Sequence, residues 1–359
     1  MTMRVLPYLL CGFLCAAGLA QEAKQEQAPT FRSTVNVVIA PVTVTDRDGS
    51  HVSGLEPKQF RLFDNGKDQT IKVDVSYVPI SLVVAVQASW NVDALLPKIQ
   101  KIGPLLENLV LGERGEAAVM AFDHRLQVLE QFTSDGDRIS AAMRKIKAGS
   151  SSSRMIDAVS ESTRMLRARN PDHRKILLLI SETRDRASEG RLRETLMEAQ
   201  INNILVYTVN INRLVTTLTA KPMPPRPDAQ PPAARGPLPM GQPSTPTTLN
   251  QTFGSRGYYA DFIPAMVELF RAAKMIFVDN PAEYLTKGTG GKEFSFSTQR
   301  GLEDAISAIG QEVHSQYLVT YNPNNKEEAG FHEIQVLIQY HPEYKTRTRP
   351  GYWLAAVYQ

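Results

Sequence analysis

Beyond its first twenty residues the sequence contains no cysteine. Its only two cysteines, Cys11 and Cys15, lie in an apolar N-terminal stretch. The rest of the chain therefore cannot form disulfides, use a thiol nucleophile or bind zinc through cysteine. A chain of 359 residues has room for one large or two ordinary domains, which a hydrophobic core can stabilise without cross-links.

The motifs of common enzyme classes are also missing. The six histidines are scattered without an H-E-x-x-H pattern, and there is no G-x-S-x-G elbow and no G-x-x-x-x-G-K-[ST] phosphate loop. Ser89 follows an apolar run, as a nucleophile would, but it lacks the flanking glycines that a sharp elbow needs. We therefore expect a protein without enzymatic activity, with a hydrolase that uses Ser89 as an alternative.

Neither sign of charge is in excess. The chain has 40 Lys and Arg residues against 37 Asp and Glu residues, which gives a scattered net charge of +3. This balance gives no support for binding to nucleic acid or to a charged membrane surface. We predict a protein partner and no nucleic acid.

The N-terminus has the pattern of a secretory signal peptide over residues 1–20. Arg4 precedes an apolar run over residues 5–19, and Gly18-Leu19-Ala20 offers small residues for cleavage. The apolar run is shorter than the roughly 20 residues that span a bilayer. We expect export to the periplasm or beyond, a disordered lead over residues 21–30, and no membrane span after cleavage.

Strand and turn patterns occupy residues 31–78. Residues 35–44 are rich in β-branched side chains, and Asp64-Asn65-Gly66 is a strong hairpin signal. Strand patterns return over residues 316–355. We predict that the two segments together form a β-sandwich-like module; the alternative is that the C-terminal strands form a small sheet of their own.

Between these segments, residues 79–315 alternate strand-like and helical patterns. The runs at residues 80–86, 175–181 and 204–211 are almost wholly apolar and do not alternate, which is typical of strands covered on both faces. Helical patterns lie over residues 92–111, 135–147, 154–169, 189–202 and 301–314. The order predicts an α/β, Rossmann-like domain with a mostly parallel central sheet and helices on both faces.

A proline-rich stretch interrupts this domain. Ten of the 23 prolines lie between positions 220 and 246, where apolar periodicity is absent. Because proline cannot continue a helix or a central strand, we predict a semi-extended surface loop over residues 213–262. Two interpretations stay open, an inert insertion and a ligand for a proline-binding partner.

Short motifs occur along the chain in a definite order. They include ISLVVAVQAS, FTSD at residues 132–135, MIDA at residues 155–158, ILLLIS, VYTV, TGG, QYLVTYNP and RPGYW. Over residues 31–353 this order resembles a von Willebrand factor A domain and, more narrowly, the bacterial VWFA-related family first described from acidobacteria. The resemblance implies a Rossmann-like sheet whose loop face can hold a divalent cation through a D-x-S-x-S motif, a threonine and an Asp-Gly pair, with a partner's acidic group completing the coordination.

This sequence departs from the cation motif. The corresponding positions hold Gln87, Ser89, Asn91, Ser153, Glu182 and Thr183. Only Glu182 can carry a negative charge, and one carboxylate balances a divalent ion poorly. We therefore expect no metal and no other cofactor. The alternative is a weak Mg²⁺ or Ca²⁺ site at Ser89, Asn91, Ser153 and Glu182.

The favoured function is protein binding through this loop face. Its predicted members are Gln87, Ser89, Trp90, Asn91, Ser153, Glu182 and Thr183. Trp90 is either an aromatic anchor for the partner or a side chain packed on the first helix. A structural scaffold whose β module makes the contacts is a further alternative. Nearby, we expect Asp123 and Asp185 to line solvated loops, and Asp157 to cap its helix or pair with an arginine.

Overall fold

The computed structural model describes residues 37–74, 78–112, 114–185, 187–211, 280–328 and 330–354. Three predicted segments lie outside the described residues: the signal peptide (1–20), the lead (21–30) and the proline-rich loop (213–262). In the described part of the chain, no helix combines the length and the apolar character needed to cross a lipid bilayer.

A six-stranded sheet forms the centre of the α/β unit. In spatial order its strands are β10 (Glu293–Phe296), β9 (Ile204–Ile211), β8 (Arg174–Ser181), β5 (Ile80–Gln87), β6 (Glu116–Phe122) and β7 (Leu126–Thr133). Neighbours pair in parallel except β6 and β7, which pair antiparallel at the edge. Every residue of β5 is buried, as its unbroken apolar run predicts. The three predicted buried strands are thus confirmed.

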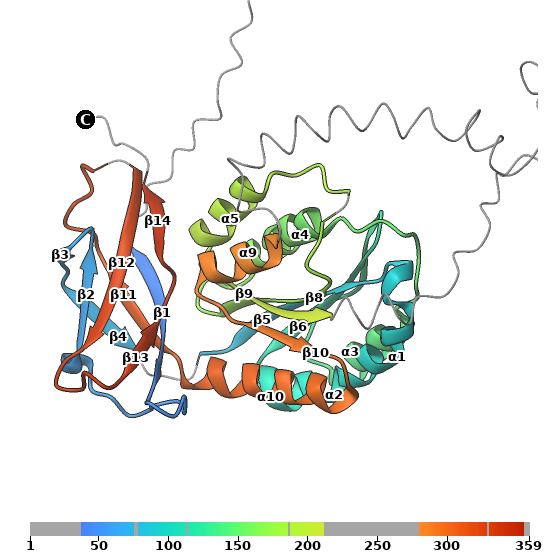
Figure 1. Cartoon of the computed structure of the whole chain (residues 1–359), viewed down its shortest axis with the longest axis horizontal. Coiled ribbons are helices and arrows are strands. Elements are labelled where there is room, and N and C mark those ends of the chain that lie inside the picture. Colours follow the sequence, from blue (N-terminus) through green and yellow to red (C-terminus); the bar gives the residue numbers. More distant parts are fainter. Residues whose placement is uncertain are drawn as a thin grey trace, which may run out of the picture. The chain divides into compact units, whose positions relative to one another are not determined.

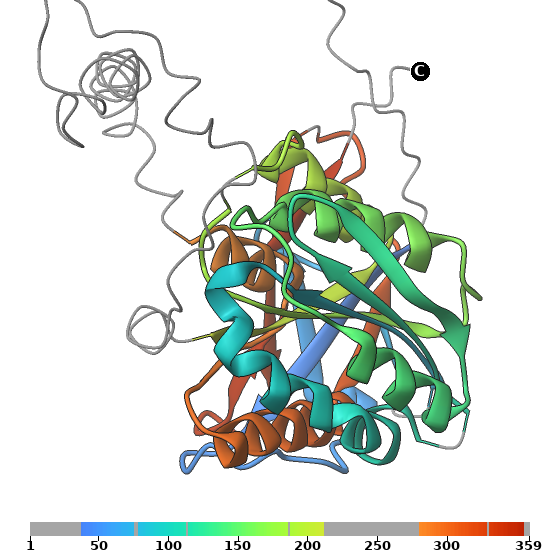
Figure 2. The same ribbon diagram turned by 90° about the vertical axis from the view of Figure 1, so that its right-hand side faces the viewer.

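Helices cover both faces of this sheet (Figures 1 and 2). One face carries α1 (Leu96–Ile99), α2 (Gly103–Leu105), α3 (Gly136–Lys145) and α10 (Gln299–Ser315), and the other carries α4 (Met155–Arg167), α5 (Leu192–Ile201) and α9 (Pro281–Thr289). The side chains of β5 alternate between the two cores: Val84 packs in the first, whereas Val83 and Ala85 pack in the second. This arrangement confirms the predicted α/β fold class.

The predicted helical segment over residues 92–111 is confirmed, but its turns are of three kinds. The segment consists of a 3₁₀ turn at Trp90–Leu95, α1, a second 3₁₀ turn at Gln100–Ile102, α2 and a π turn at Leu106–Leu111. Pro97 and Pro104 lack the N–H that a continuous helix needs, and each lies in the first turn of a short helix, where proline is tolerated. The two prolines therefore divide the segment.

The remaining described strands form two four-stranded sheets, with the orders β13–β1–β11–β4 and β14–β12–β2–β3. They are β1 (Val38–Thr45), β2 (Phe60–Asp64), β3 (Lys67–Asp68), β4 (Ile71–Asp74), β11 (Tyr317–Tyr321), β12 (Gly330–Ile338), β13 (Lys345–Arg347) and β14 (Gly351–Leu354). Because β1 pairs with β11 and β2 with β12, each sheet joins strands from both ends of the chain. Val42, Leu62, Val319 and Val336 share one core between the sheets. The accompanying β-sandwich-like module is confirmed.

The turn between β2 and β3 is the predicted hairpin. Asn65 and Gly66 both have positive φ angles, 49° and 77°. A two-residue turn of this hand matches the right-handed twist of the flanking strands, and asparagine followed by glycine tolerates it best. The sequence Asp64-Asn65-Gly66 therefore fixes the register of this pair of strands.

Asp64 ties the two sheets of the β module together. Its fully buried carboxylate accepts hydrogen bonds from Tyr321 Oη (2.9 Å) in one sheet and Tyr352 Oη (2.8 Å) in the other. His332 Nδ1 lies 2.7 Å from the second carboxylate oxygen, and His332 Nε2 lies 2.6 Å from the carbonyl oxygen of Glu328. Both ring nitrogens of His332 therefore face an oxygen atom at hydrogen-bond distance.

A second buried network joins the β module to the α/β unit. Tyr207 in β9 is fully buried, and its hydroxyl donates to Glu312 Oε1 in α10 (2.7 Å). The side-chain amide of Gln316 donates to Tyr207 Oη (3.0 Å) and to Thr43 Oγ1 in β1 (3.1 Å). Arg347 in β13 pairs with Glu312. Burial raises the pKa of Tyr207, so its hydroxyl remains a hydrogen-bond donor.

Replacing Asp64 with alanine tests the first network. Asp64→Ala leaves His332 and two tyrosine hydroxyls without their acceptor, so we expect the free energy of unfolding to fall by about 3–5 kcal/mol. The matched control is Asp68→Ala, which removes the partner of Arg61 in a half-exposed ion pair and is expected to lower that free energy by at most about 1 kcal/mol. Guanidinium unfolding measures both, and equal losses would contradict the role of Asp64.

Candidate functional site

Four loops meet at the carboxyl end of the central sheet. Three follow β5, β6 and β8, and the fourth joins α3 to α4. The strand order reverses at β5, which is where an open α/β sheet binds its ligands. Backbone hydrogen bonds connect them: Ala88 N donates to the carbonyl of Phe122 (2.8 Å), and Gly149 N to the carbonyl of Ala88 (2.7 Å). Trp90 N donates to the carbonyl of Ser150 (2.8 Å). We call this end of the sheet the loop face.

The side-chain amide of Gln87 lies at the centre of the loop face. Its Oε1 atom accepts the backbone N–H of Glu182 (2.8 Å), which fixes the orientation of the amide group. Its Nε2 atom donates to Ser89 Oγ (2.7 Å) and lies 3.4 Å from Glu182 Oε2. A neutral NH₂ group thus faces the same two oxygen atoms that the resemblance assigned to a cation.

Burial divides the predicted site residues into two groups. The side chains of Gln87 and Ser89 are fully buried, and Ser153 and Glu182 are nearly so. The half-buried group consists of Trp90, Asn91 and Thr183. The buried residues therefore hold the loops in place, and only the second group can touch a partner directly. That the loop face binds a partner stays a prediction.

Asp123 corrects another prediction, since it does not line a solvated loop. It is 4% exposed and accepts hydrogen bonds from the backbone N–H groups of Ser150 and Arg125 (both 2.8 Å) and from His124 Nδ1 (3.0 Å). Burial alone would raise the pKa of Asp123, but these hydrogen bonds outweigh it and the pKa lies below its ordinary value. A Cβ atom on Gly149 would collide with this carboxylate, so only glycine fits there.

Asp157 and Asp185 fasten the loop after β8 onto α4. Asp157 accepts a hydrogen bond from Arg154 Nε (2.7 Å), which confirms the predicted pairing with an arginine, and another from the N–H of Gly190 (2.8 Å). Asp185 accepts the N–H of Ile156 in the first turn of α4 (2.8 Å) and is half-buried rather than solvated. The other oxygen of Asp185 accepts the backbone N–H groups two and three residues further along the chain. This is a local turn pattern of aspartate, so the sequence could have indicated these two contacts.

The residues of the loop face do not fit a divalent cation. Mg²⁺ and Ca²⁺ need several oxygen ligands and a balancing negative charge, whereas Glu182 is the one carboxylate among the positions carried over from the motif. Gln87 presents hydrogen atoms, not its oxygen, towards Ser89 and Glu182. Across the described ranges, no cluster of three or more His, Cys, Asp or Glu side chains has a metal-binding arrangement.

Among the residues that the structure describes, the hydrogen bond found for Ser89 Oγ does not activate it as a nucleophile. A catalytic serine must pass its proton to a base within hydrogen-bond distance. Ser89 Oγ is buried and accepts a hydrogen bond from the amide of Gln87, which is a donor and not a base. This contact gives no support to the hydrolase alternative.

Comparisons with known proteins bear on the fold. No protein-family model and no curated protein matches the chain. An aerotolerance-related membrane protein from Bacteroides fragilis is similar in structure, with 13% identity, 65% of this chain and 98% of that chain covered, and a TM-score of 0.40. BatB from Bacteroides thetaiotaomicron has 15% identity, coverage of 37% and 66%, and a TM-score of 0.33. The vWF domain of the pili tip protein Mfa5 from Porphyromonas gingivalis has 15% identity, coverage of 30% and 38%, and a TM-score of 0.27.

The α/β unit has the Rossmann-like fold that the sequence predicts, and von Willebrand factor A domains are among the solved structures that resemble it. Its mostly parallel sheet has helices on both faces and a loop face at the carboxyl end of β5. At the identities found, the likeness to solved structures concerns the fold alone. The narrower relation to the acidobacterial family stays a prediction.

The hydrogen bonds of Asp123 predict acid sensitivity of the loop face. Because its folded pKa is depressed, the stability it contributes is present above the ordinary Asp value of 3.8 and is lost as the pH falls through the folded pKa. We expect Asp123→Asn to lower the free energy of unfolding by about 1.5–3 kcal/mol at pH 7, the range for hydrogen bonds to a charged group. The gap to the wild type should narrow as the pH falls below about 3.8.

Urea unfolding between pH 7 and pH 3 measures this gap. The exposed Asp48 supplies the control, because Asp48→Asn should change the free energy of unfolding by less than about 0.5 kcal/mol at every pH. A gap between wild type and Asp123→Asn that stays constant down to pH 3 would rule out the proposed hydrogen-bonded carboxylate.

Proposed function

We propose that this chain is an exported protein-binding protein whose loop face is organised without a metal ion. The observation that carries the proposal is the amide of Gln87, which donates to Ser89 and faces Glu182 from the centre of the site. A cation in that place would hold the loops by attracting their oxygen atoms. Here the NH₂ group of Gln87 holds the loops instead, and the Oε1 atom of the same amide accepts the backbone N–H of Glu182.

A loop face held in this way is preorganised for binding. Asp123, Asp157 and Asp185 accept backbone N–H groups from the surrounding loops, so few groups need to be ordered when a partner arrives. The half-buried Trp90 and Asn91 then offer contact surface next to Thr183. Tryptophan is among the residues that most often carry binding energy in interfaces. The proposed partner is a protein, bound through shape and hydrogen bonds.

Export rests on the N-terminal sequence. Arg4, the apolar run and the small residues before Gln21 have the order of a secretory signal. A chain that has no cysteine after such a signal does not depend on an oxidising compartment for its fold. We therefore propose that the protein acts in the periplasm or outside the cell.

One observation favours a second candidate, a cation-dependent adhesin. Ser153 Oγ is buried and has no hydrogen-bond partner within the described part of the chain. A bound ion or a water molecule would satisfy it. Ser89, Asn91, Ser153 and Glu182 would then be the ligands.

Thermal melting with magnesium separates the two candidates. If Gln87 replaces the cation, 5 mM Mg²⁺ should shift the melting temperature of the wild type by less than about 1 °C. Gln87→Asp restores a second carboxylate, so its melting temperature should rise with Mg²⁺ by several degrees, corresponding to about 2–3 kcal/mol at 100-fold excess over Kd. A wild-type rise of several degrees that Glu182→Ala abolishes would establish the cation-dependent adhesin instead.

The contribution of Trp90 can be tested with a photo-reactive amino acid at that position. Once the captured partner has been purified, Trp90→Ala should weaken its binding at least tenfold, about 1.4 kcal/mol or more, with an unchanged melting temperature. Tyr340, which is 86% exposed in the β module, is the matched control for removal of an aromatic ring. If Tyr340→Ala abolishes binding and Trp90→Ala does not, the β module makes the contacts and the loop face is only a scaffold.

A further inference from the structure

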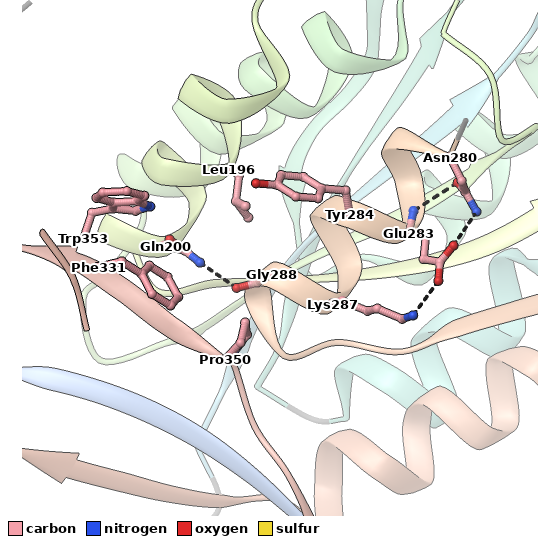
Figure 3. A pocket seen from close by; sticks show the side chains of 10 residues that line it. All are labelled: Leu196, Gln200, Asn280, Glu283, Tyr284, Lys287, Gly288, Phe331, Pro350 and Trp353. Carbon is pink, nitrogen blue, oxygen red and sulfur yellow. Dashed lines mark hydrogen bonds and ion pairs between the residues drawn. The ribbon is translucent and has the colours of Figure 1, made fainter. Parts of the chain in front are cut away.

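An aromatic groove lies where the β module meets the α/β unit. It has a volume of about 540 Å³ and is bordered by α5, α9, β12 and the segment that carries β14 (Figure 3). Leu196 and Gly288 contribute an apolar wall from the helices. Tyr284, Phe331, Pro350 and Trp353 contribute three aromatic rings and a proline ring. No residue of the loop face lines this groove.

The rings in the groove are partly open to solvent. Tyr284 is 38% exposed and Phe331 is 42% exposed. Phe331 packs edge-on against Trp353 with ring centroids 5.5 Å apart, and the guanidinium of Arg193 lies 4.7 Å from the ring centroid of Trp353. These contacts hold the rings in place, and a cluster of exposed apolar side chains of this kind marks a binding surface.

The groove also contains an unused acceptor. The NH₂ group of Gln200 donates to the carbonyl of Gly288 (2.7 Å), but Gln200 Oε1 is buried without a hydrogen-bond partner among the described residues. Figure 3 shows Gln200 between the rings of Trp353 and Phe331 and the helix that carries Tyr284. Aromatic rings next to a few polar groups are the features by which grooves bind proline-rich segments in the polyproline II conformation.

The chain itself contains such a segment. The described part of the α/β unit leaves off at Ile211, the end of β9, and resumes at Asn280, a residue that lines the groove. Ten prolines lie within residues 222–246 of this interval, at positions 222, 224, 225, 227, 231, 232, 237, 239, 243 and 246. They include the overlapping P-x-x-P patterns at residues 222–225 and 224–227.

We propose that the groove binds the chain's own proline-rich segment, residues 221–246. Position 246 and Asn280 are only 34 residues apart in the sequence, so the segment and the groove are joined by a short tether. Tethering at this distance gives an effective concentration on the order of millimolar, so even a weak proline–aromatic contact is populated. This proposal does not depend on the function of the loop face.

Tryptophan fluorescence tests the proposal. Trp90→Phe leaves Trp353 as the sole tryptophan of the chain. In one variant, a Gly-Ser segment of equal length replaces residues 221–246. We expect acrylamide to quench Trp353 about twofold more efficiently in this variant than in the full chain. A synthetic peptide of residues 221–246 should bind the variant and protect Trp353 from acrylamide again. Half-saturation of the full chain should require at least tenfold more peptide, because its own segment competes at an effective concentration of about millimolar.

Two controls make the outcome specific. A peptide with all ten prolines replaced by alanine should bind at least tenfold more weakly. Tyr284→Ala should weaken peptide binding to the Gly-Ser variant at least fivefold, and Phe331→Ser should do the same, whereas Tyr340→Ala, which removes an exposed ring outside the groove, should not. Far-UV circular dichroism confirms that each variant is folded.

Other outcomes overturn the proposal. Equal quenching in both chains would mean that the segment does not cover Trp353. Equal peptide affinity for both chains would exclude competition within the chain. Protection that increases with protein concentration would show that a second copy supplies the segment. Unchanged binding of the alanine peptide would show that proline is not what the groove recognises.

Discussion

A polar side chain at the buried end of a strand must find its hydrogen bonds inside the protein, and this constraint governs the loop face. Strand β5 is buried on both faces up to Gln87. An unpaired amide there would lower the stability by several kcal/mol. Gln87 satisfies it by binding Ser89 in its own loop and the backbone of Glu182 after β8. The same contacts that solve the burial problem also fix how the two loops lie.

Similar networks occur wherever parts of this chain meet. Asp64 joins the two sheets of the β module, and Gln316 and Arg347 connect that module to Tyr207 and Glu312 of the α/β unit. Each network is buried, and each takes its members from strands or helices far apart in sequence. Apolar cores supply most of the burial, but they are not directional. The hydrogen-bonded groups at the junctions fix how the neighbouring parts are oriented. The chain has no cysteine beyond its first twenty residues, so disulfides cannot fix this orientation.

Local sequence predicts those parts of this fold that local physics determines. The sequence predicts strands β5, β8 and β9 because a strand that is buried on both faces consists mainly of apolar residues. It predicts the Asn65-Gly66 turn because asparagine and glycine tolerate a positive φ best. The changes of turn type between residues 90 and 111 were not predicted, because the apolar periodicity continues across the two prolines. The contacts of Asp123 with Ser150 and of Asp185 with Ile156 could not be predicted, because only the folded loops bring these backbone N–H groups to the carboxylates.

The groove and the predicted loop-face site are lined by different residues. The walls of the groove come from both units, with Leu196 on α5 and Trp353 on β14. Whatever fills the groove contacts both units at once and binds only when they are together, so it stabilises the junction that Gln316 and Arg347 already hold.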